Sequence, residues 1–371
     1  MTPQPDTSAL VTWDELVRKV PGSDVTQLSA WADIRRVAGF EPLYVFARRG
    51  TELVGGALVI WRRLPLAGEV GYVPYGPLIS VDADRGPAIA VLAAALRRLA
   101  HGELSMLFVQ PPLGGDDVSL ELLRLGFRRS HAGIAPEASV RVDLARDEED
   151  LRAGLSKDMR RRARKWPQLG VRVRHGTQDD VALLARLHAA SAQHHGFEPI
   201  PLDYMANLYR RLAPAGHAEL FVGEIEGRPV FVDLLTGCGG VLKGRLTGMD
   251  RDSAAARAGV SAAVRWEAMR WAKANGYRWF DFGGIRDSAV AALVDNRPDS
   301  SPVTGDDAYK VSFGGTPFRY AMPVEIISSP VVRVAYDLTR RWPVGRRLVE
   351  RTSNRLRATR ASGGGGADQA K

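Results

Sequence analysis

The spacing of apolar residues predicts short strands that alternate with amphipathic helices. Residues 43–47 and 53–61 are apolar runs separated by the polar segment RRGTE, which predicts an antiparallel hairpin. Glycine-containing turns at 227–228 and 237–240 separate a second series of predicted strands, at 220–226, 230–236 and 241–249. From residue 258 to residue 275 the apolar positions recur at helical spacing, as on one face of a long helix.

The same order of elements occurs twice along the chain. Residues 25–130 and residues 175–320 each contain helices, antiparallel strands, a long helix and then two final strands. The two halves share negligible sequence identity, so the repeat rests on the pattern alone. At 371 residues the chain also exceeds the usual size of a single hydrophobic core. We therefore expect two copies of one mixed α/β unit.

One stretch combines a buried strand with candidate chemistry. Residues 279–285, WFDFGGI, are aromatic or apolar except for Asp281 and two glycines, which predicts a strand that stops at a turn. A polar loop with two prolines follows, and then Tyr309 and Lys310 stand at the expected entry to another strand. A lysine beside a rigid sheet edge is a typical functional position. We interpret Asp281 as a structural hydrogen-bond acceptor, because its neighbours are aromatic.

A charged helix is predicted at residues 147–166. Its acidic residues come first and its basic residues last, an order that the helix dipole favours. Six cations fall within nine residues of this helix, namely Lys157, Arg160, Arg161, Arg162, Arg164 and Lys165. They are spread around more than one face, which suits the phosphates of a nucleic-acid backbone. A solvated helix end is the alternative that the pattern leaves open.

Composition narrows the class of protein further. The chain has 51 Lys and Arg against 42 Asp and Glu, a net charge of +9 and a pI near 9.9, which favours a polyanionic partner. The single cysteine, Cys238, excludes an internal disulfide and a cysteine-rich metal site. No apolar run reaches the length of a membrane span, and the N-terminus lacks the features of a signal peptide. We therefore expect a cytoplasmic protein.

Six short segments, taken in order, resemble the Fem family of peptidyltransferases (FemABX-type). They are LSAWADIR, GYVPYGP, KDMRRRARKWPQLGV, HHGFEPIPLDYM, YRWFDFGGI and AYKVSFGG, and together they extend over nearly the whole chain. Each segment alone is weakly specific, whereas the ordered set is fairly specific. The resemblance implies an α/β (α+β) fold of two tandem GNAT-like acyltransferase domains, each with helices around a mixed, mainly antiparallel sheet.

The resemblance also implies domain limits. We expect the first GNAT-like domain at residues 1–146 and the second, which carries the catalytic lysine, at residues 147–330. Residues 331–360 would pack back onto the first domain, and the glycine-rich residues 361–371 would form a disordered tail. We expect a monomer whose membrane contact is no more than peripheral, through the basic residues near the C-terminus.

The activity implied by the resemblance is transfer of an amino acid from aminoacyl-tRNA to an amine, with formation of an amide bond. Lys310 matches the lysine of the family's Phe-Lys motif, and Tyr309 occupies its aromatic position. The ammonium of Lys310 would stabilise the oxyanion that forms as the amine attacks the ester. The expected tRNA-binding residues are Lys157, Arg160, Arg161, Arg164 and Lys165. Aminoacyl-tRNA is then the co-substrate, and we expect no cofactor and no metal.

The acceptor implied by the resemblance is an amine of a peptidoglycan precursor. Arg35 stands where the family often carries a lysine that contacts the diphosphate of that precursor, and an arginine keeps the charge. A charge on a surface helix is the alternative reading of Arg35. The expected acceptor-binding residues are Arg35, Trp31, Tyr72, Tyr75, Gln110 and His194.

Three departures from the family's pattern bear on the acceptor. His194 and His195 stand where the family typically has Arg-Asp, Tyr75 replaces an arginine, and Gln110 replaces an aspartate that precedes proline. These changes favour a smaller amine, as in a natural-product pathway, as an alternative to the peptidoglycan precursor. The two histidines have no third ligand in the sequence, which argues against a metal site. We also predict that Gln110→Asp does not raise activity.

Two other classes of function fit the same fold. An acyl-CoA-dependent N-acetyltransferase would hold the CoA pyrophosphate with a Gln/Arg-x-x-Gly-x-Gly/Ala loop at a helix N-terminus. Here Ala256 precedes Gly259 by three residues, so the loop lacks its signature and a tRNA donor is favoured. A non-catalytic RNA-binding protein is the second alternative, and the intact pair Tyr309-Lys310 argues against it. The sequence contains no nucleophile elbow, so we expect no covalent intermediate.

Overall fold

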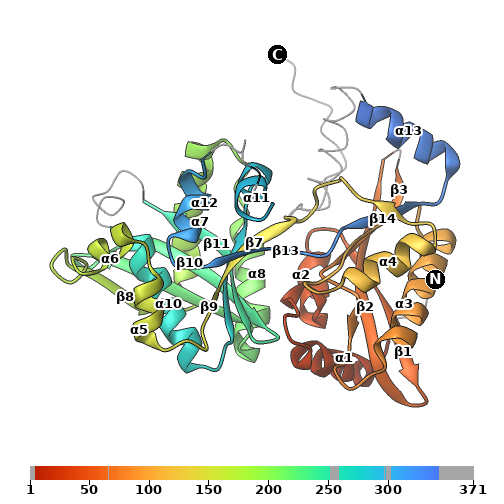
Figure 1. The fold of residues 1–371 in the computed structure, drawn as a ribbon, viewed down its shortest axis with the longest axis horizontal. Helices are drawn as coiled ribbons and strands as arrows, with labels where there is room; N and C mark the ends of the chain where they lie inside the picture. Colours follow the sequence, from red (N-terminus) through yellow and green to blue (C-terminus); the bar gives the residue numbers. More distant parts are fainter. Residues whose placement is uncertain (1–4, 66, 251–258, 296, 298–301, 342–371) are drawn as a thin grey trace.

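The computed structural model describes residues 5–341, apart from 66, 251–258, 296 and 298–301. Figure 1 shows two lobes side by side, each built around one seven-stranded sheet. Helices flank both sheets, so the predicted α/β class and the tandem arrangement are confirmed. Within the described residues, no helix combines the length and the apolar character needed to cross a membrane.

The first lobe contains a mixed sheet with the strand order β1-β2-β3-β5-β14-β6, and β4 pairs with β2. Its strands are β1 (Glu41–Arg49), β2 (Glu52–Leu64), β3 (Gly68–Pro74), β4 (Leu78–Ile79), β5 (Met106–Gln110), β6 (Arg128–Arg129) and β14 (Val324–Ile327). The predicted hairpin is confirmed, since β1 and β2 pair antiparallel with Leu43 opposite Val59. β3 and β5 are parallel neighbours.

The second lobe contains a sheet with the order β13-β7-β12-β11-β10-β9-β8. Its strands are β7 (Ala138–Asp143), β8 (Val171–His175), β9 (Ala218–Ile225), β10 (Arg228–Cys238), β11 (Val241–Met249), β12 (Trp279–Gly284) and β13 (Thr316–Arg319). The three strands predicted between residues 220 and 249 are confirmed as β9, β10 and β11, which pair antiparallel. β11 and β12 pair in parallel only from 241–243 to 279–281, although both strands continue.

Each sheet includes a strand from beyond the expected domain limits. β7 lies before residue 146, yet it pairs with β12 and β13 of the second sheet. β14 lies before residue 330, yet it pairs with β5 and β6 of the first sheet. The expected limits therefore need a correction of one strand each, because an apolar pattern shows that a strand is buried but not which sheet it joins. Figure 1 shows the chain crossing between the lobes before β7 and again between β13 and β14.

Helices cover both faces of each sheet. The helices of the first lobe are α1 (Thr7–Lys19), α2 (Ser29–Arg36), α3 (Arg85–Gly102) and α4 (Asp116–Arg124), with a short 3-10 turn η1 (Val25–Gln27) before α2. The second lobe contains α5 (Glu148–Gly154), α6 (Lys157–Ala163), α7 (Asp180–His195), α8 (Leu202–Leu212), α10 (Val260–Ala274), α11 (Asp287–Leu293), α12 (Gly305–Val311) and the 3-10 turn η2 (Ala213–Ala215). The predicted long helix of the second half is confirmed as α10.

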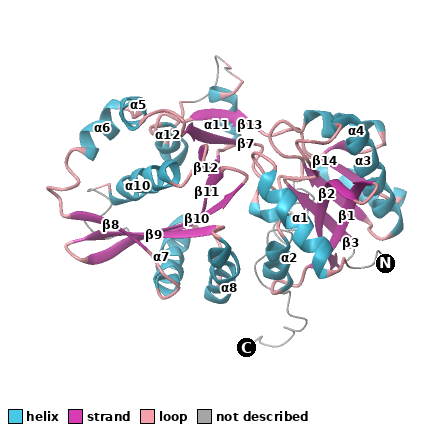
Figure 2. Cartoon of the chain, turned by 90° about the horizontal axis from the view of Figure 1, so that it is seen from below, coloured by secondary structure: helices cyan, strands magenta, loops and turns pink. Residues whose placement is uncertain are grey.

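One apolar core joins the two lobes. Trp13 and Ile34, on α1 and α2, belong to the same buried cluster as Leu184 and Leu208, on α7 and α8. α2 packs against α8, and Figure 2 shows these helices between the two sheets. Full burial of a large apolar side chain stabilises by about 1.5–3 kcal/mol, so this shared core holds the lobes together.

Two predictions of secondary structure are wrong. The charged helix predicted at 147–166 is two short helices, α5 and α6, because Leu155 is extended and Ser156 caps a new helix by accepting from the amide of Met159 at 3.2 Å. Lys310 lies in helix α12 rather than at the entry to a strand. The acidic pair Asp306 and Asp307 in the first turn of α12 favours a helix start there.

The last described element is helix α13 (Pro330–Arg341), which lies against the first lobe. Arg333 Nη1 is 3.1 Å from Glu325 Oε1 on β14, and the hydroxyl of Tyr336 donates to Glu325 Oε2 at 3.2 Å. Residues 342–371 lie outside the described part of the chain. They include the rest of the 331–360 segment and the tail predicted at 361–371.

Candidate active site

Lys310 lies on the wall of a cavity of about 600 Å³ between α12, the end of β12 and the linker 131–137 that joins the lobes. Its side chain is only 10% exposed. The ammonium donates to the carbonyl of Gly284 at 2.6 Å and is 2.8 Å from Asp306 Oδ2. Among the described residues these are its two polar partners, which leaves one of its three N–H donors for a ligand.

The end of β12 fixes the carbonyl that holds Lys310. Asp281 Oδ1 accepts from the amide of Gly283 at 2.8 Å and from the hydroxyl of Ser139 at 2.5 Å. Gly283 has a φ of 86°, a backbone region that favours glycine, so the chain turns directly before Gly284. The predicted role of Asp281 as a structural acceptor is confirmed, and the amide that it holds, that of Gly283, directly precedes Gly284, whose carbonyl accepts from Lys310.

Tyr309 points away from this cavity into the core of the second lobe. Its hydroxyl donates to Ser261 Oγ at 3.3 Å, and its ring packs edge-on against Phe313 with centroids 5.2 Å apart. The guanidinium of Arg265 lies 5.2 Å from the centre of the same ring. The structure therefore separates the two residues predicted as catalytic. Lys310 faces the cavity, and Tyr309 supports α12 from within the core.

A buried ion pair behind Tyr309 was missed in the sequence. Arg265 Nε, on α10, lies 3.2 Å from Asp233 Oδ2, on β10, and Asp233 is fully buried. Burial raises the pKa of the Asp233 carboxyl, and the charge of Arg265 opposes that shift. The other oxygen of Asp233 has no hydrogen-bond partner among the described residues. A carboxylate in the middle of the apolar strand FVDLL was the signal that could have revealed it.

The cavity at Lys310 continues into a second one of about 650 Å³. The two share His131, Glu137 and Asp287 on their walls, so together they form one groove along the junction of the lobes. Arg319, in the larger part, lies 3.4 Å from Glu137 and 2.6 Å from Asp295. The groove thus presents charges of both signs, which can bind carboxylate and ammonium groups of a ligand.

The predicted tRNA-binding residues lie on and after α6, close to α12. The amide of Ser156, at the start of α6, donates to the carbonyl of Ser312, two residues beyond Lys310, at 2.8 Å. Three of these cations are exposed and form no ion pair with any described residue: Lys157, Arg164 and Lys165. The other cations are engaged. Arg161 and Arg162 pair with Asp158 at 2.6 and 2.7 Å, and Arg160 donates to the carbonyls of Ala153 and Leu155.

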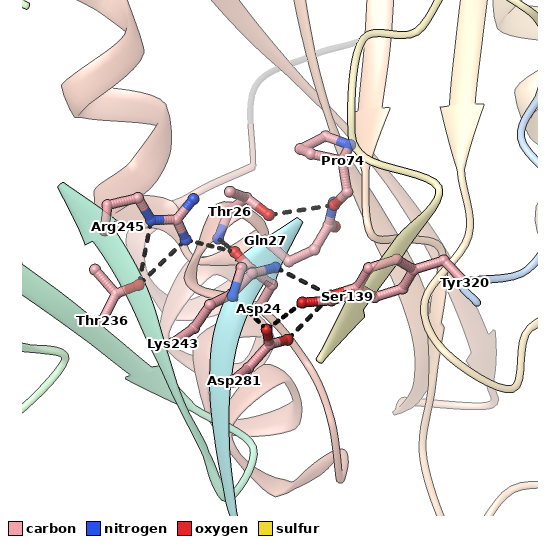
Figure 3. Close-up of polar contacts among 11 residues, drawn as sticks. Asp24, Thr26, Gln27, Pro74, Ser139, Thr236, Lys243, Arg245, Asp281 and Tyr320 are labelled. Carbon is pink, nitrogen blue, oxygen red and sulfur yellow. Dashed lines mark hydrogen bonds and ion pairs between the residues drawn. The ribbon is translucent and has the colours of Figure 1, made fainter. Parts of the chain in front are cut away.

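A second group of charges joins the lobes at the first half of β11. Asp24, just before η1 in the first lobe, is 3.2 Å from Lys243 Nζ and 3.0 Å from Arg245 Nη2, both on β11 (Figure 3). Burial by itself raises the pKa of the Asp24 carboxyl, but the charges of Lys243 and Arg245 outweigh it and hold that pKa below its usual range. No sequence pattern indicated this cluster, because its members are about 220 residues apart.

Two of the predicted acceptor-binding residues contact this cluster. Tyr75 has an unusual positive φ of 51°, and its ring centre lies 4.2 Å from Lys243 Nζ and 5.0 Å from the ring of Tyr320. The ring of Trp31 lies 5.3 Å from the guanidinium of Arg245. Both rings are buried, so they pack at the junction of the lobes.

The other four predicted acceptor residues lie elsewhere. Arg35 is buried on α2, with Nη1 3.4 Å from the hydroxyl of Tyr204 on α8. Tyr72 and Gln110 line a small cavity of about 20 Å³ in the first lobe, and His194 is exposed at the end of α7. Of the residues described, none of the six predicted acceptor residues lines the groove beside Lys310.

Comparison with known proteins agrees with this geometry. A family model described as an acetyltransferase (GNAT) domain matches residues 153–311, a range that ends just after Lys310. A lipid II:glycine glycyltransferase of Staphylococcus saprophyticus is 25% identical over 236 residues, which cover 60% of this chain and 56% of that protein. A protein of the same name from Staphylococcus aureus is 23% identical over 227 residues, covering 57% and 53%.

Solved structures show the same fold. FemX superposes with a TM-score of 0.75 at 17% identity, over 90% of this chain and 99% of FemX. The chain is thus similar in sequence to the lipid II:glycine glycyltransferases and in fold to FemX. A tandem GNAT protein from the clavulanic acid biosynthesis pathway also shares the fold, with a TM-score of 0.53 at 15% identity over 88% and 96% of the two chains. The chain spans little more than half of the length of the curated relatives that it matches.

Proposed function

We propose that this protein is a member of the Fem family, and that it transfers an aminoacyl group from aminoacyl-tRNA to an amine of a peptidoglycan precursor. The observation that carries the proposal is the buried ammonium of Lys310, held 2.6 Å from the Gly284 carbonyl on the wall of a groove between the lobes. The relatives named lipid II:glycine glycyltransferase support both the reaction and the class of acceptor.

The reaction proceeds by attack of the acceptor amine on the ester carbonyl at the 3′ end of the tRNA. A C–N bond forms, the ester C–O bond breaks, and the proton lost by the amine balances the one gained by the departing ribose hydroxyl. The carbonyl oxygen of the ester becomes an oxyanion in the transition state. The free N–H of Lys310 stabilises this oxyanion, and such preorganised donors are often the largest single term in catalysis.

The distribution of charge suggests different binding surfaces for the tRNA donor and the acceptor. Lys157, Arg164 and Lys165 are exposed cations on and after α6, a helix whose start contacts the end of α12, and they attract the phosphates of the tRNA acceptor arm. The groove beyond Lys310 contains both arginines and carboxylates, which suits a peptide-like acceptor with charges of both signs. Donor and acceptor then meet at Lys310, and holding them in attack geometry lowers the barrier further.

The test is a transfer assay with the purified protein. Total tRNA charged with radiolabelled amino acids is the donor, and peptidoglycan precursors and a small-molecule extract are separate acceptor pools. Parallel reactions contain RNase, or labelled acetyl-CoA in place of the charged tRNA. We expect RNase-sensitive labelling of the precursor pool.

The other outcomes each replace part of the proposal. RNase-sensitive labelling of the small-molecule pool alone would retain the donor and overturn the acceptor. Labelling from acetyl-CoA alone would make the protein an N-acetyltransferase and overturn the proposed donor. Binding of tRNA without any transfer would reduce it to an RNA-binding protein.

A further inference from the structure

A series of polar contacts, joined through the backbone between Gly283 and Gly284, links the first lobe to Lys310. Asp24 of the first lobe is 3.2 Å from Lys243 Nζ, which donates to the hydroxyl of Tyr320 at 3.2 Å. That hydroxyl donates to Asp281 Oδ2 at 3.2 Å, as Figure 3 shows. The remaining links are from Asp281 to Gly283 and from Gly284 to Lys310, at 2.8 and 2.6 Å.

Tyr320 is the member of the chain that depends on both lobes. It lies between β13 and β14, in the segment that crosses from the second lobe to the first. Its ring contacts Tyr75 of the first lobe and Phe318 of the second, with centroids 5.0 Å apart in both pairs. A displacement of one lobe against the other would therefore break its contacts.

The residues of this series of contacts are buried, and each hydroxyl or ammonium among them acts as a hydrogen-bond donor to a defined partner. Asp24, Tyr320 and Asp281 are at most 9% exposed. Burial raises the pKa of Tyr320 well above its usual value, so its hydroxyl stays protonated and can donate to Asp281 while accepting from Lys243. Buried hydrogen bonds of this kind are costly to break, because water does not replace the lost partner.

We propose that Tyr320 and Asp281 are positioning residues that hold the Lys310 ammonium in its catalytic place only while the two lobes are docked. This inference rests on the proposed catalytic role of Lys310. Asp281 fixes the amide of Gly283, the turn at Gly283 aims the carbonyl of Gly284, and that carbonyl holds Lys310. Tyr320 ties Asp281 to Lys243 and so to Asp24 in the other lobe. Tyr320 also lines the larger part of the groove.

The variant Tyr320→Phe tests this chain, because it removes one hydroxyl and keeps the ring that packs on Tyr75 and Phe318. We expect kcat for aminoacyl transfer to fall by about tenfold to a hundredfold, which is the cost of displacing the Lys310 ammonium by about 1 Å. The KM for charged tRNA stays within about twofold, because the cations on α6 are unaltered. Asp281→Ala should likewise lower kcat and leave the KM for charged tRNA unchanged. Asp281→Asn keeps an oxygen that can accept from the amide of Gly283, so it should retain part of the kcat.

A second readout does not depend on activity. The reaction of Lys310 with trinitrobenzenesulfonate, followed by peptide mass spectrometry on the substrate-free protein, reports how firmly its amine is held. We expect faster modification of Lys310 in Tyr320→Phe than in the wild type. The matched control is Tyr336→Phe, which removes a hydroxyl that also lies 3.2 Å from a buried carboxylate, Glu325, but stands outside the chain. This control leaves both kcat and the modification rate unchanged.

The inference would be overturned if Tyr320→Phe kept the kcat of the wild type and its rate of Lys310 modification, whatever thermal stability the variant had lost. A lower kcat with unchanged modification of Lys310 would also overturn it, because the loss would then arise elsewhere. If the wild-type protein transfers no aminoacyl group, the proposed function fails instead. The modification rates then still decide whether Tyr320 positions Lys310.

Discussion

Lys310 and Lys273 show how one type of side chain takes two roles in the same lobe. Lys273 donates to the carbonyls of Leu144 and Arg146 at 2.9 and 2.7 Å, which ties α10 to the chain between β7 and α5. Lys310 also donates to a carbonyl, but it faces a cavity of about 600 Å³ and keeps one donor for a ligand. The cavity, rather than the amine, distinguishes Lys310, which we propose to be catalytic, from the structural Lys273.

Gln110→Asp is expected to destabilise the protein without raising activity. The side-chain amide of Gln110 is buried and donates to the carbonyls of Pro111 and Ala321 at 3.1 and 3.0 Å. An ionised aspartate has no donor, so it would set a carboxylate against two carbonyls, at a cost of about 1–3 kcal/mol for each unsatisfied group. Urea unfolding and the transfer assay measure the two effects.

The comparison variant for this prediction is Gln110→Asn, which keeps the amide and should lose less stability. A large gain in kcat on Gln110→Asp would contradict the structural role of Gln110. It would show instead that a carboxylate base had been lost at this position.

The sequence predicted Lys310 as the catalytic residue but did not predict its surroundings. The motif around Lys310 was recognisable because its residues are neighbours in the chain. The carbonyl that accepts from it belongs to Gly284, 26 residues earlier, and the series of contacts continues to Asp24 in the other lobe. For Tyr309 the sequence was misleading in the opposite way: it is next to Lys310 in the chain but points into the core, since adjacent residues on a helix point in different directions.

At the scale of single elements, the break between α5 and α6 shapes the basic surface. A continuous helix would have spread its cations along a straight rod, whereas the cap at Ser156 turns α6 toward Ser312 and α12. The sequence analysis overlooked this cap, because the acidic start and the basic end agreed with a single helix. Serine followed by a polar first turn was the available signal.

We expect the double variant Arg164→Ala/Lys165→Ala to bind charged tRNA more weakly. Both side chains are exposed and have no ion pair among the described residues. Each phosphate contact that is lost should reduce the slope of log K against log salt by about 0.7–0.9. Filter binding over a range of salt concentrations measures this slope.

The matched control is Arg97→Ala/Arg98→Ala, which removes two exposed charges from α3 in the first lobe. It lowers the net charge equally and should leave the slope unchanged. Equal losses in the two double variants would contradict a tRNA site at α6, since they would reflect net charge alone.

At the scale of the whole molecule, the lobes are joined by more than a linker. They exchange strands β7 and β14, share one apolar core and meet at the ion cluster of Asp24. The tandem arrangement could be predicted from the repeated order of elements. The exchange could not, because strand patterns are alike on both sides of each expected limit.

Asp24→Asn should lower the free energy of unfolding by about 3–5 kcal/mol near neutral pH, because it leaves two buried cations without their carboxylate. Since the folded state holds the pKa of Asp24 below its usual range, this contribution is present above the ordinary carboxyl pKa of about 3.9. It is lost as the pH falls below that value and the Asp24 carboxyl becomes protonated. Denaturant unfolding of both proteins between neutral and acidic pH measures the difference.

Asp158→Asn is the control for this prediction. Asp158 also pairs with two arginines, but its side chain is 51% exposed, so solvent screens the interaction and no measurable loss is expected. A difference between wild type and Asp24→Asn that grows on acidification would contradict the direction of the pKa shift.

The most direct measurement is single-turnover transfer by Lys310→Met, with aminoacyl-tRNA prebound to the protein and acceptor added in excess. The account predicts a rate about a hundredfold to a thousandfold below wild type, the usual cost of removing an oxyanion donor, with tRNA binding unchanged. Lys273→Met is the matched control and should transfer at the wild-type rate once both proteins are compared at equal folded fraction. Transfer by Lys310→Met at the wild-type rate would contradict the central claim that this ammonium stabilises the transition state.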